Sequence, residues 1–168
     1  LPNLAKDWEW SSDRKSLTMN LIEGARWSDG DIFDTEDIDF WWNDNVQDAN
    51  VASRLPKDAL GAGTTLEILG PYSFKFNFDE PKGNAVLAQL AYMGGAPGPS
   101  HVMKPLHPAH NSDATYESYA NGMPASVLPI VTLGAYVPVV HKVDELMVMK
   151  RNPYYWKVDE AVSYTHLT

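Results

Sequence analysis

Acidic residues and histidines are the side chains of this sequence best suited to chemistry, and their spacing raises two possible metal sites. Six acidic residues lie between positions 29 and 39, where an EF-hand would need oxygen ligands at loop positions 1, 3 and 5 and glycine at position 6. Counted from Asp29, position 5 is Phe33 and position 6 is not glycine, so the calcium pattern fails. His107 and His110 have a spacing that two zinc ligands can use, but a zinc site needs further ligands. Turns, helix caps and hydrogen-bonding loop histidines explain both groups, and we expect no metal or cofactor.

Motifs for catalysis are missing from the sequence. Ser100 lies in Gly98-Pro99-Ser100-His101-Val102, which is not the Gly-x-Ser-x-Gly nucleophile elbow. There is no phosphate-binding loop and no Gly-x-Gly-x-x-Gly motif, and no two carboxylates are singled out as a hydrolytic pair. The absence of cysteine excludes disulfides, thiolate zinc sites and thiol nucleophiles. We therefore expect a binding protein and not an enzyme.

The aromatic content is high, with six Trp, eight Tyr and five Phe. Trp41 and Trp42 are neighbours in a predicted helix, so their side chains point about 100° apart. One arrangement buries one ring and leaves the other at a surface where it can stack on a ligand. In the alternative, both rings are packed, because each offers a large apolar area.

Composition and charge limit the possible partners. The 168 residues contain 13 basic and 22 acidic residues, a net charge of −9, which disfavours nucleic acid and anionic membranes as partners. With 44% hydrophobic and 21% charged residues, the chain has the composition of a soluble globular domain. It lacks an apolar run of the roughly 18 residues that a membrane helix needs, and it shows no signal peptide.

Hydrophobic periodicity predicts antiparallel hairpins and a few short helices. Alternating apolar residues predict the strands. Apolar residues at helical spacing predict a first helix, which Asp34 or Thr35 can cap. The prolines between positions 97 and 108 predict an extended loop. The predicted strands are 4–10, 17–21, 25–27, 66–68, 72–78, 136–141 and 145–150, with Gly70-Pro71 as the turn of the central hairpin. Three helices are predicted: one with the face Ile38, Trp41, Trp42 and Val46, one at 84–93 and one at 112–121.

A series of motifs runs in a fixed order along nearly the whole chain. The longest are Gly24-Ala25-Arg26-Trp27-Ser28-Asp29-Gly30, Thr35-Glu36-Asp37-Ile38 and Arg151-Asn152-Pro153-Tyr154-Tyr155-Trp156. Together with segments at 4–10, 17–21, 72–81, 98–104, 107–108 and 134–136, they resemble the extracellular solute-binding protein family 5. These are the peptide- and nickel-class receptors of ABC importers. Ala135 departs from the proline that the family usually has at this place.

The resemblance implies an α+β fold that forms part of one lobe of a two-lobed, type II-like periplasmic-binding-protein fold. Residues 1–132 are then a partial first lobe, and residues 133–161 are its closing strand pair. The second lobe is missing from the chain. Residues 162–168 differ from the segment that follows in resembling chains, and we interpret them as a non-native tail.

The implied function is the substrate-binding component of an ABC importer. It captures peptides or peptide-like solutes in the periplasm or at the cell surface, as a monomer, and delivers them to the permease subunits. The resemblance also leaves oligosaccharide solutes open, because a fold does not fix the ligand. Aromatic side chains and polar groups bind such solutes, and the candidate ligand-binding residues are Trp41, Trp42, Asn45 and Asn50.

Two other classes compete with the receptor. A carbohydrate-binding module or glycoside-hydrolase fragment would use the aromatic residues to stack on sugars. A metal-dependent hydrolase would use the loop histidines.

Overall fold

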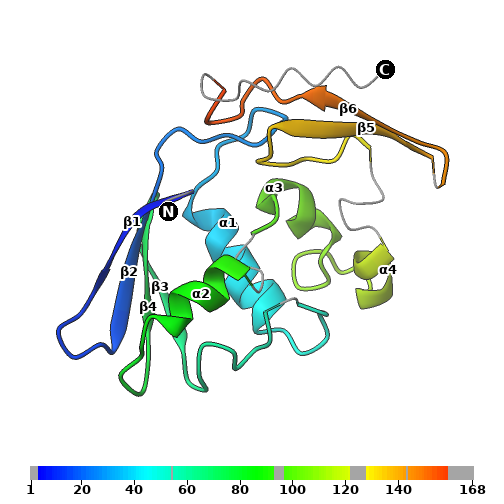
Figure 1. The fold of residues 1–168 in the computed structure, drawn as a ribbon. Coiled ribbons are helices and arrows are strands. Elements are labelled where there is room, and N and C mark those ends of the chain that lie inside the picture. Colours follow the sequence, from blue (N-terminus) through cyan, green and yellow to red (C-terminus); the bar gives the residue numbers. More distant parts are fainter. Residues whose placement is uncertain (1–3, 54, 93–96, 122–127, 143, 159–168) are drawn as a thin grey trace.

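The computed structural model describes residues 4–53, 55–92, 97–121, 128–142 and 144–158, which form two antiparallel sheets with short helices between them (Figure 1). The predicted α+β architecture is confirmed. The strands are β1 (Ala5–Trp10), β2 (Ser16–Leu21), β3 (Thr65–Gly70), β4 (Ser73–Asn77), β5 (Tyr136–Lys142) and β6 (Leu146–Arg151). The helical segments are α1 (Thr35–Asp39), the π-helix η1 (Phe40–Val46), α2 (Ala85–Tyr92), α3 (Ser100–Met103), the 3-10 helix η2 (Lys104–Leu106) and α4 (Tyr116–Asn121).

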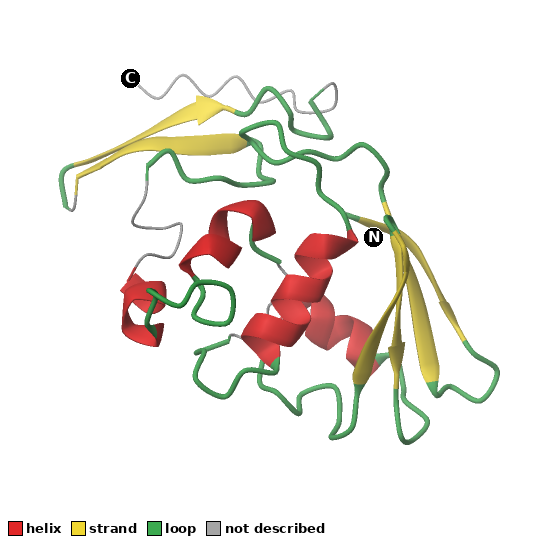
Figure 2. Cartoon of the chain, turned by 180° about the vertical axis from the view of Figure 1, so that it is seen from behind, coloured by secondary structure: helices red, strands yellow, loops and turns green. Residues whose placement is uncertain are grey.

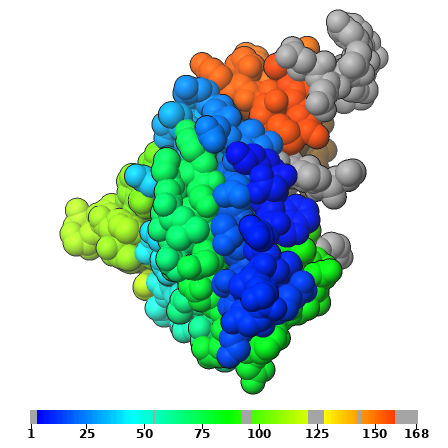
Figure 3. All heavy atoms as spheres, turned by 90° about the vertical axis from the view of Figure 1, so that its left-hand side faces the viewer, coloured from blue at the N-terminus to red at the C-terminus, as the bar shows by residue number. Residues whose placement is uncertain are grey.

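The four-stranded sheet has the order β1-β2-β4-β3, and alternation along its strands separates an apolar from a polar face. One row of paired residues across the sheet consists of Trp10, Leu17, Phe76 and Leu66. The adjacent row, which points to the other face, consists of Glu9, Thr18, Lys75 and Glu67. Figure 3 looks onto this polar face, where the blue β1–β2 hairpin lies beside the green β3–β4 hairpin. A slip of one residue would exchange the two rows, so burial of the apolar row fixes the register.

Helices α1 and α2 cover the apolar face of this sheet (Figure 2). Asp34 caps α1 by accepting a hydrogen bond from the Glu36 N–H, and the Asp37 carboxylate accepts one from the Asp34 N–H, which completes a capping box. The predicted helical face is confirmed, because all four of its residues are buried in the main core: Ile38, Trp41, Trp42 and Val46.

Three predicted elements differ in the structure. The proline-rich segment is not an extended loop throughout, because α3 and η2 lie within it. Pro99 is the N-cap of α3 and Pro105 lies in the first turn of η2, where a missing N–H costs no helical hydrogen bond. The predicted strand at 25–27 is reduced to a single bridge between Arg26 and Ile32. The predicted helix at 112–121 begins only at Tyr116.

Strands β5 and β6 confirm the predicted strand pair and form a separate two-stranded sheet. The turn around Gly30 joins it to the rest of the structure. The Ser28 N–H donates to the Thr132 carbonyl (2.9 Å), and the Thr132 N–H donates to Ser28 Oγ (3.1 Å). Gly30 has a φ of +99°, which strains other residues, and a Cβ there would lie 3.2 Å from the Tyr154 ring and push it away. The division into lobe segments at 132 and 133 stays a prediction, and residues 162–168 lie outside the described residues.

The described helices are all too short or too polar to cross a bilayer.

Replacing Trp42 by alanine tests its role in the core. Trp42 is 1% exposed, so we expect Trp42→Ala to lower the free energy of unfolding of the chain by about 3–5 kcal/mol. Urea denaturation followed by far-UV circular dichroism measures the change. The matched control is Asn43→Ala, a neighbouring exposed position. Equal stability of the two variants would contradict the assigned core role.

The β5–β6 hairpin leaves a run of apolar side chains exposed: Val140, Leu146, Met147 and Met149. Because an exposed apolar strand can pair with other chains, we expect the 168-residue chain to self-associate as its concentration rises. The double substitution Leu146→Lys with Met149→Lys should reduce this association, as measured by size-exclusion chromatography with light scattering. Thr65→Lys, on the polar face of the four-stranded sheet, should leave it unchanged. Association that persists in the double variant would place the contact elsewhere.

Candidate functional site

The two tryptophans among the predicted ligand-binding residues are both buried, with 7% of Trp41 and 1% of Trp42 exposed. Their ring centroids lie 5.9 Å apart, and the Trp42 ring meets the Phe76 ring edge-on at 5.0 Å. Of the two arrangements considered from the sequence, the structure has the one in which both rings pack. Their participation in ligand binding stays a prediction.

Asn45 and Asn50 lie at the C-terminal end of η1 and just after it, in different environments. Asn45 is buried, donates from Nδ2 to the Phe40 carbonyl (3.1 Å) and accepts at Oδ1 from the Tyr119 hydroxyl (2.5 Å). Burial raises the pKa of Tyr119 far above its ordinary value, so the hydroxyl stays protonated and can donate. Asn50 is exposed. The structure thus gives Asn45 an internal bonding role and leaves Asn50 accessible to solvent.

Asp48, which the sequence did not single out, joins this region to α4. Its Oδ2 accepts a hydrogen bond from the Tyr116 hydroxyl (2.7 Å), and its Oδ1 accepts from the Asn50 N–H (2.8 Å) and from Asn50 Nδ2 (3.0 Å). Desolvation opposes the charged form, but these hydrogen bonds outweigh it and hold the pKa of Asp48 below its ordinary value. The residue is therefore a carboxylate at neutral pH.

Two of the loop histidines face the acidic residues at this end of η1. His110 Nε2 lies 3.1 Å from Asp44 Oδ2. His107 is fully buried, and its Nδ1 accepts a hydrogen bond from the Ala109 N–H (3.1 Å). The spacing of His107 and His110 was visible in the sequence, but the pairing with η1 was not, because it links residues 66 positions apart.

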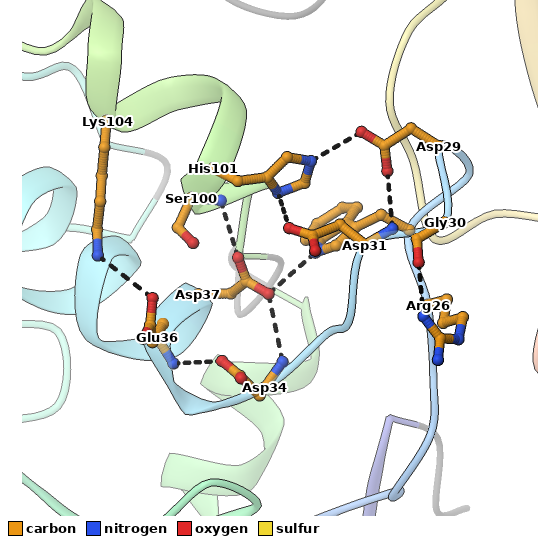
Figure 4. A network of polar contacts seen from close by, with 11 residues as sticks. Arg26, Asp29, Gly30, Asp31, Asp34, Glu36, Asp37, Ser100, His101 and Lys104 are labelled. Carbon is orange, nitrogen blue, oxygen red and sulfur yellow. Dashed lines mark hydrogen bonds and ion pairs between the residues drawn. The ribbon is translucent and has the colours of Figure 1, made fainter.

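A second polar network centres on the buried carboxylate of Asp37 (Figure 4). Oδ2 accepts hydrogen bonds from Trp27 Nε1 (2.9 Å) and the Asp34 N–H (3.3 Å), and Oδ1 accepts from the Ser100 N–H (2.8 Å). These bonds connect the turn before α1, the first turn of α1 and the start of α3.

His101, which lies in α3, reinforces the same junction. His101 Nε2 lies 2.7 Å from Asp29 Oδ2, and Nδ1 lies 3.0 Å from Asp31 Oδ2 (Figure 4). The acidic run between positions 29 and 39 thus serves turns and caps, as predicted. The contact of Asp29 and Asp31 with His101 was not predicted. Across the described ranges, no group of three or more metal-binding side chains is arranged to hold an ion.

Comparison with known proteins places these features in a family. The model of one protein family, described as "Bacterial extracellular solute-binding proteins, family 5 Middle", matches residues 1–167 of this chain. A periplasmic alpha-galactoside-binding protein of Rhizobium meliloti (strain 1021) is 47% identical over 163 residues, which is 96% of this chain and 23% of that protein.

Two solved structures are similar to the structure of this chain. The periplasmic binding protein MelB of Agrobacterium fabrum C58, in complex with stachyose, has a TM-score of 0.86 and 42% identity, covering 93% of this chain and 24% of that one. An oligopeptide-binding protein OppA has a TM-score of 0.78 and 28% identity, covering 93% of this chain and 26% of that one.

This chain spans about a quarter of the length of these similar proteins. The match nevertheless covers nearly all of its own residues, as the ordered motifs predicted. The chain belongs to the bacterial extracellular solute-binding proteins, family 5.

Proposed function

We propose that the protein is the substrate-binding component of an ABC importer and that its solutes are α-galactosides. The observation that carries the choice of solute is the 47% identity to a periplasmic alpha-galactoside-binding protein. The similarity to MelB in complex with stachyose, at 42% identity, supports the same class. The solute would then be an oligosaccharide, where the sequence alone favoured a peptide.

The side chains at the end of η1 suit such a ligand. A neutral sugar presents hydroxyl groups that donate and accept hydrogen bonds, together with apolar ring faces that can stack on aromatic rings. Asp44 and Asp48 supply acceptors, Asn50 supplies an amide that can donate and accept, and Tyr116 supplies an aromatic ring. A sugar needs no cation to balance its charge, which is compatible with a net charge of −9.

Peptides remain the second candidate solute, as the sequence first indicated. The observation in favour is the similarity to the oligopeptide-binding protein OppA, at 28% identity. A peptide would be held through its main-chain hydrogen bonds, with aromatic walls against its side chains.

The remaining assignments follow from this role. The protein would act outside the cytoplasmic membrane, as a monomer that delivers its solute to the permease subunits, and by binding without turnover. Of the four predicted ligand residues, Asn50 is the exposed one and would contact the solute directly. Trp41, Trp42 and Asn45 would support this region from the core.

Titration of the whole protein distinguishes the two solutes. We expect saturable heat of binding with stachyose and raffinose in isothermal titration calorimetry, and none with trialanine. The control is a disaccharide without an α-galactosyl unit, such as maltose. Saturable binding of trialanine without binding of stachyose would favour the peptide assignment.

The 168-residue chain alone should bind stachyose much more weakly than the whole protein does. Binding sites for small molecules bury about 70–90% of the ligand surface, and this chain spans only 23% of the similar alpha-galactoside-binding protein. We expect no saturation up to about 1 mM stachyose, a limit that corresponds to roughly −4 kcal/mol. Tight, one-to-one binding by this chain would show that it encloses the solute without help.

A further inference from the structure

The polar side chains at the C-terminal end of η1 are held by hydrogen bonds to one another and are also partly exposed to solvent. Asp44 and Asp48 have side chains that are 20% and 16% exposed, and His110 and Tyr116 are more exposed, at 37% and 36%. Each is fixed by a hydrogen bond within the cluster, between His110 and Asp44 or between Tyr116 and Asp48. Side chains held in this way lose little conformational entropy when they bind a ligand.

The cluster has spare capacity for hydroxyl groups. A carboxylate offers two lone pairs on each oxygen. Asp48 Oδ1 accepts two hydrogen bonds, both from Asn50, whereas Oδ2 accepts one, from Tyr116. A ligand hydroxyl can therefore donate to Asp48 Oδ2 and accept from a neighbouring donor, while the exposed part of the Tyr116 ring can lie against an apolar ring face.

A buried and unpaired donor lies directly behind Asp48. His107 is 0% exposed, and because its Nδ1 accepts from Ala109, the neutral ring carries its proton on Nε2. This Nε2 has no hydrogen-bond partner and lies 3.9 Å from Asp48 Oδ2. A hydrogen bond needs about 2.7–3.2 Å, so a shift of roughly 1 Å of the carboxylate would complete it. The present arrangement thus leaves unmade a bond that a small movement can form.

We propose that Asp44, Asp48, Asn50, His110 and Tyr116 form a subsite for one hydroxyl-bearing ring of an oligosaccharide, with His107 as the positioning residue of Asp48. A ligand hydroxyl that donates to Asp48 Oδ2 in place of the Tyr116 hydroxyl leaves the second lone pair of this oxygen for His107 Nε2. The carboxylate is then free to approach His107 Nε2, and the new bond favours the ligand-bound state over the free one. This inference rests on the proposed function and names the part of this chain that contacts the sugar.

Stachyose titration of the whole protein and of three variants tests the subsite. We expect Asp48→Asn and Tyr116→Ala to weaken stachyose binding about 10- to 100-fold, since each removes a bond to or from a charged group or a stacking ring. His107→Phe keeps an aromatic ring among Phe40, Tyr116 and Tyr119 but removes the donor, and it should weaken binding about tenfold. Glu117→Gln, an exposed acid on α4, is the matched control and should bind as the wild type does.

A spectroscopic measurement distinguishes a positioning role of His107 from a role in the stability of the fold. In the whole protein labelled with ¹⁵N-histidine, stachyose should shift the His107 Nε2 resonance towards that of a hydrogen-bonded N–H. This shift should disappear in Asp48→Ala, which leaves His107 Nε2 no side-chain acceptor at position 48, and melting curves report whether each variant is folded.

The outcomes separate this inference from the proposed function. If the wild-type protein binds stachyose and neither Asp48→Asn nor Tyr116→Ala alters the affinity, the subsite is overturned while the α-galactoside assignment stands. The same holds if the His107 resonance does not respond to stachyose in the wild type. If the wild type binds no α-galactoside, the proposed function itself fails.

Discussion

The buried carboxylate of Asp37 is the interaction on which the arrangement of the helices depends. A carboxylate that is 2% exposed is tolerated only when its oxygens are hydrogen-bonded, and here the donors come from Trp27, Asp34 and Ser100. Each donor left unpaired would cost about 1–3 kcal/mol. One side chain therefore fixes the turn before α1, the cap of α1 and the start of α3 relative to one another (Figure 4).

The segments that Asp37 holds together continue into the two other parts of the described structure. On one side, the turn at Ser28 and Gly30 carries the contacts to Thr132 and Tyr154 that hold the β5–β6 hairpin. On the other side, α3 and η2 lead into the loop whose histidines face the end of η1. The proposed sugar subsite thus depends on a network that lies outside it, because α3 sets where this loop begins.

Local patterns were reliable where a single element buries one face. The alternation of Phe74, Phe76 and Phe78 predicted a strand, and all three are buried. The face that contains Trp42 predicted a helix in the same way. The proline-rich segment was mispredicted because proline excludes a sheet ladder but is accepted in the first turn of a helix, as at Pro105. Sequence therefore anticipated most of the elements, and it missed the short ones whose ends are fixed by distant groups.

The amino-acid sequence by itself determined the hairpins, the helical face of α1 and η1, and the family, since these follow from periodicity and ordered motifs. Only the tertiary structure decided that Trp41 and Trp42 are both buried and that Asp48, Tyr116 and His107 meet. The physical reason is separation along the chain. Asp37 and Ser100 are 63 residues apart, and Asp48 and Tyr116 are 68 apart. Hydrogen bonds over such separations leave no periodic trace in the local sequence and form only when packing brings the two segments together.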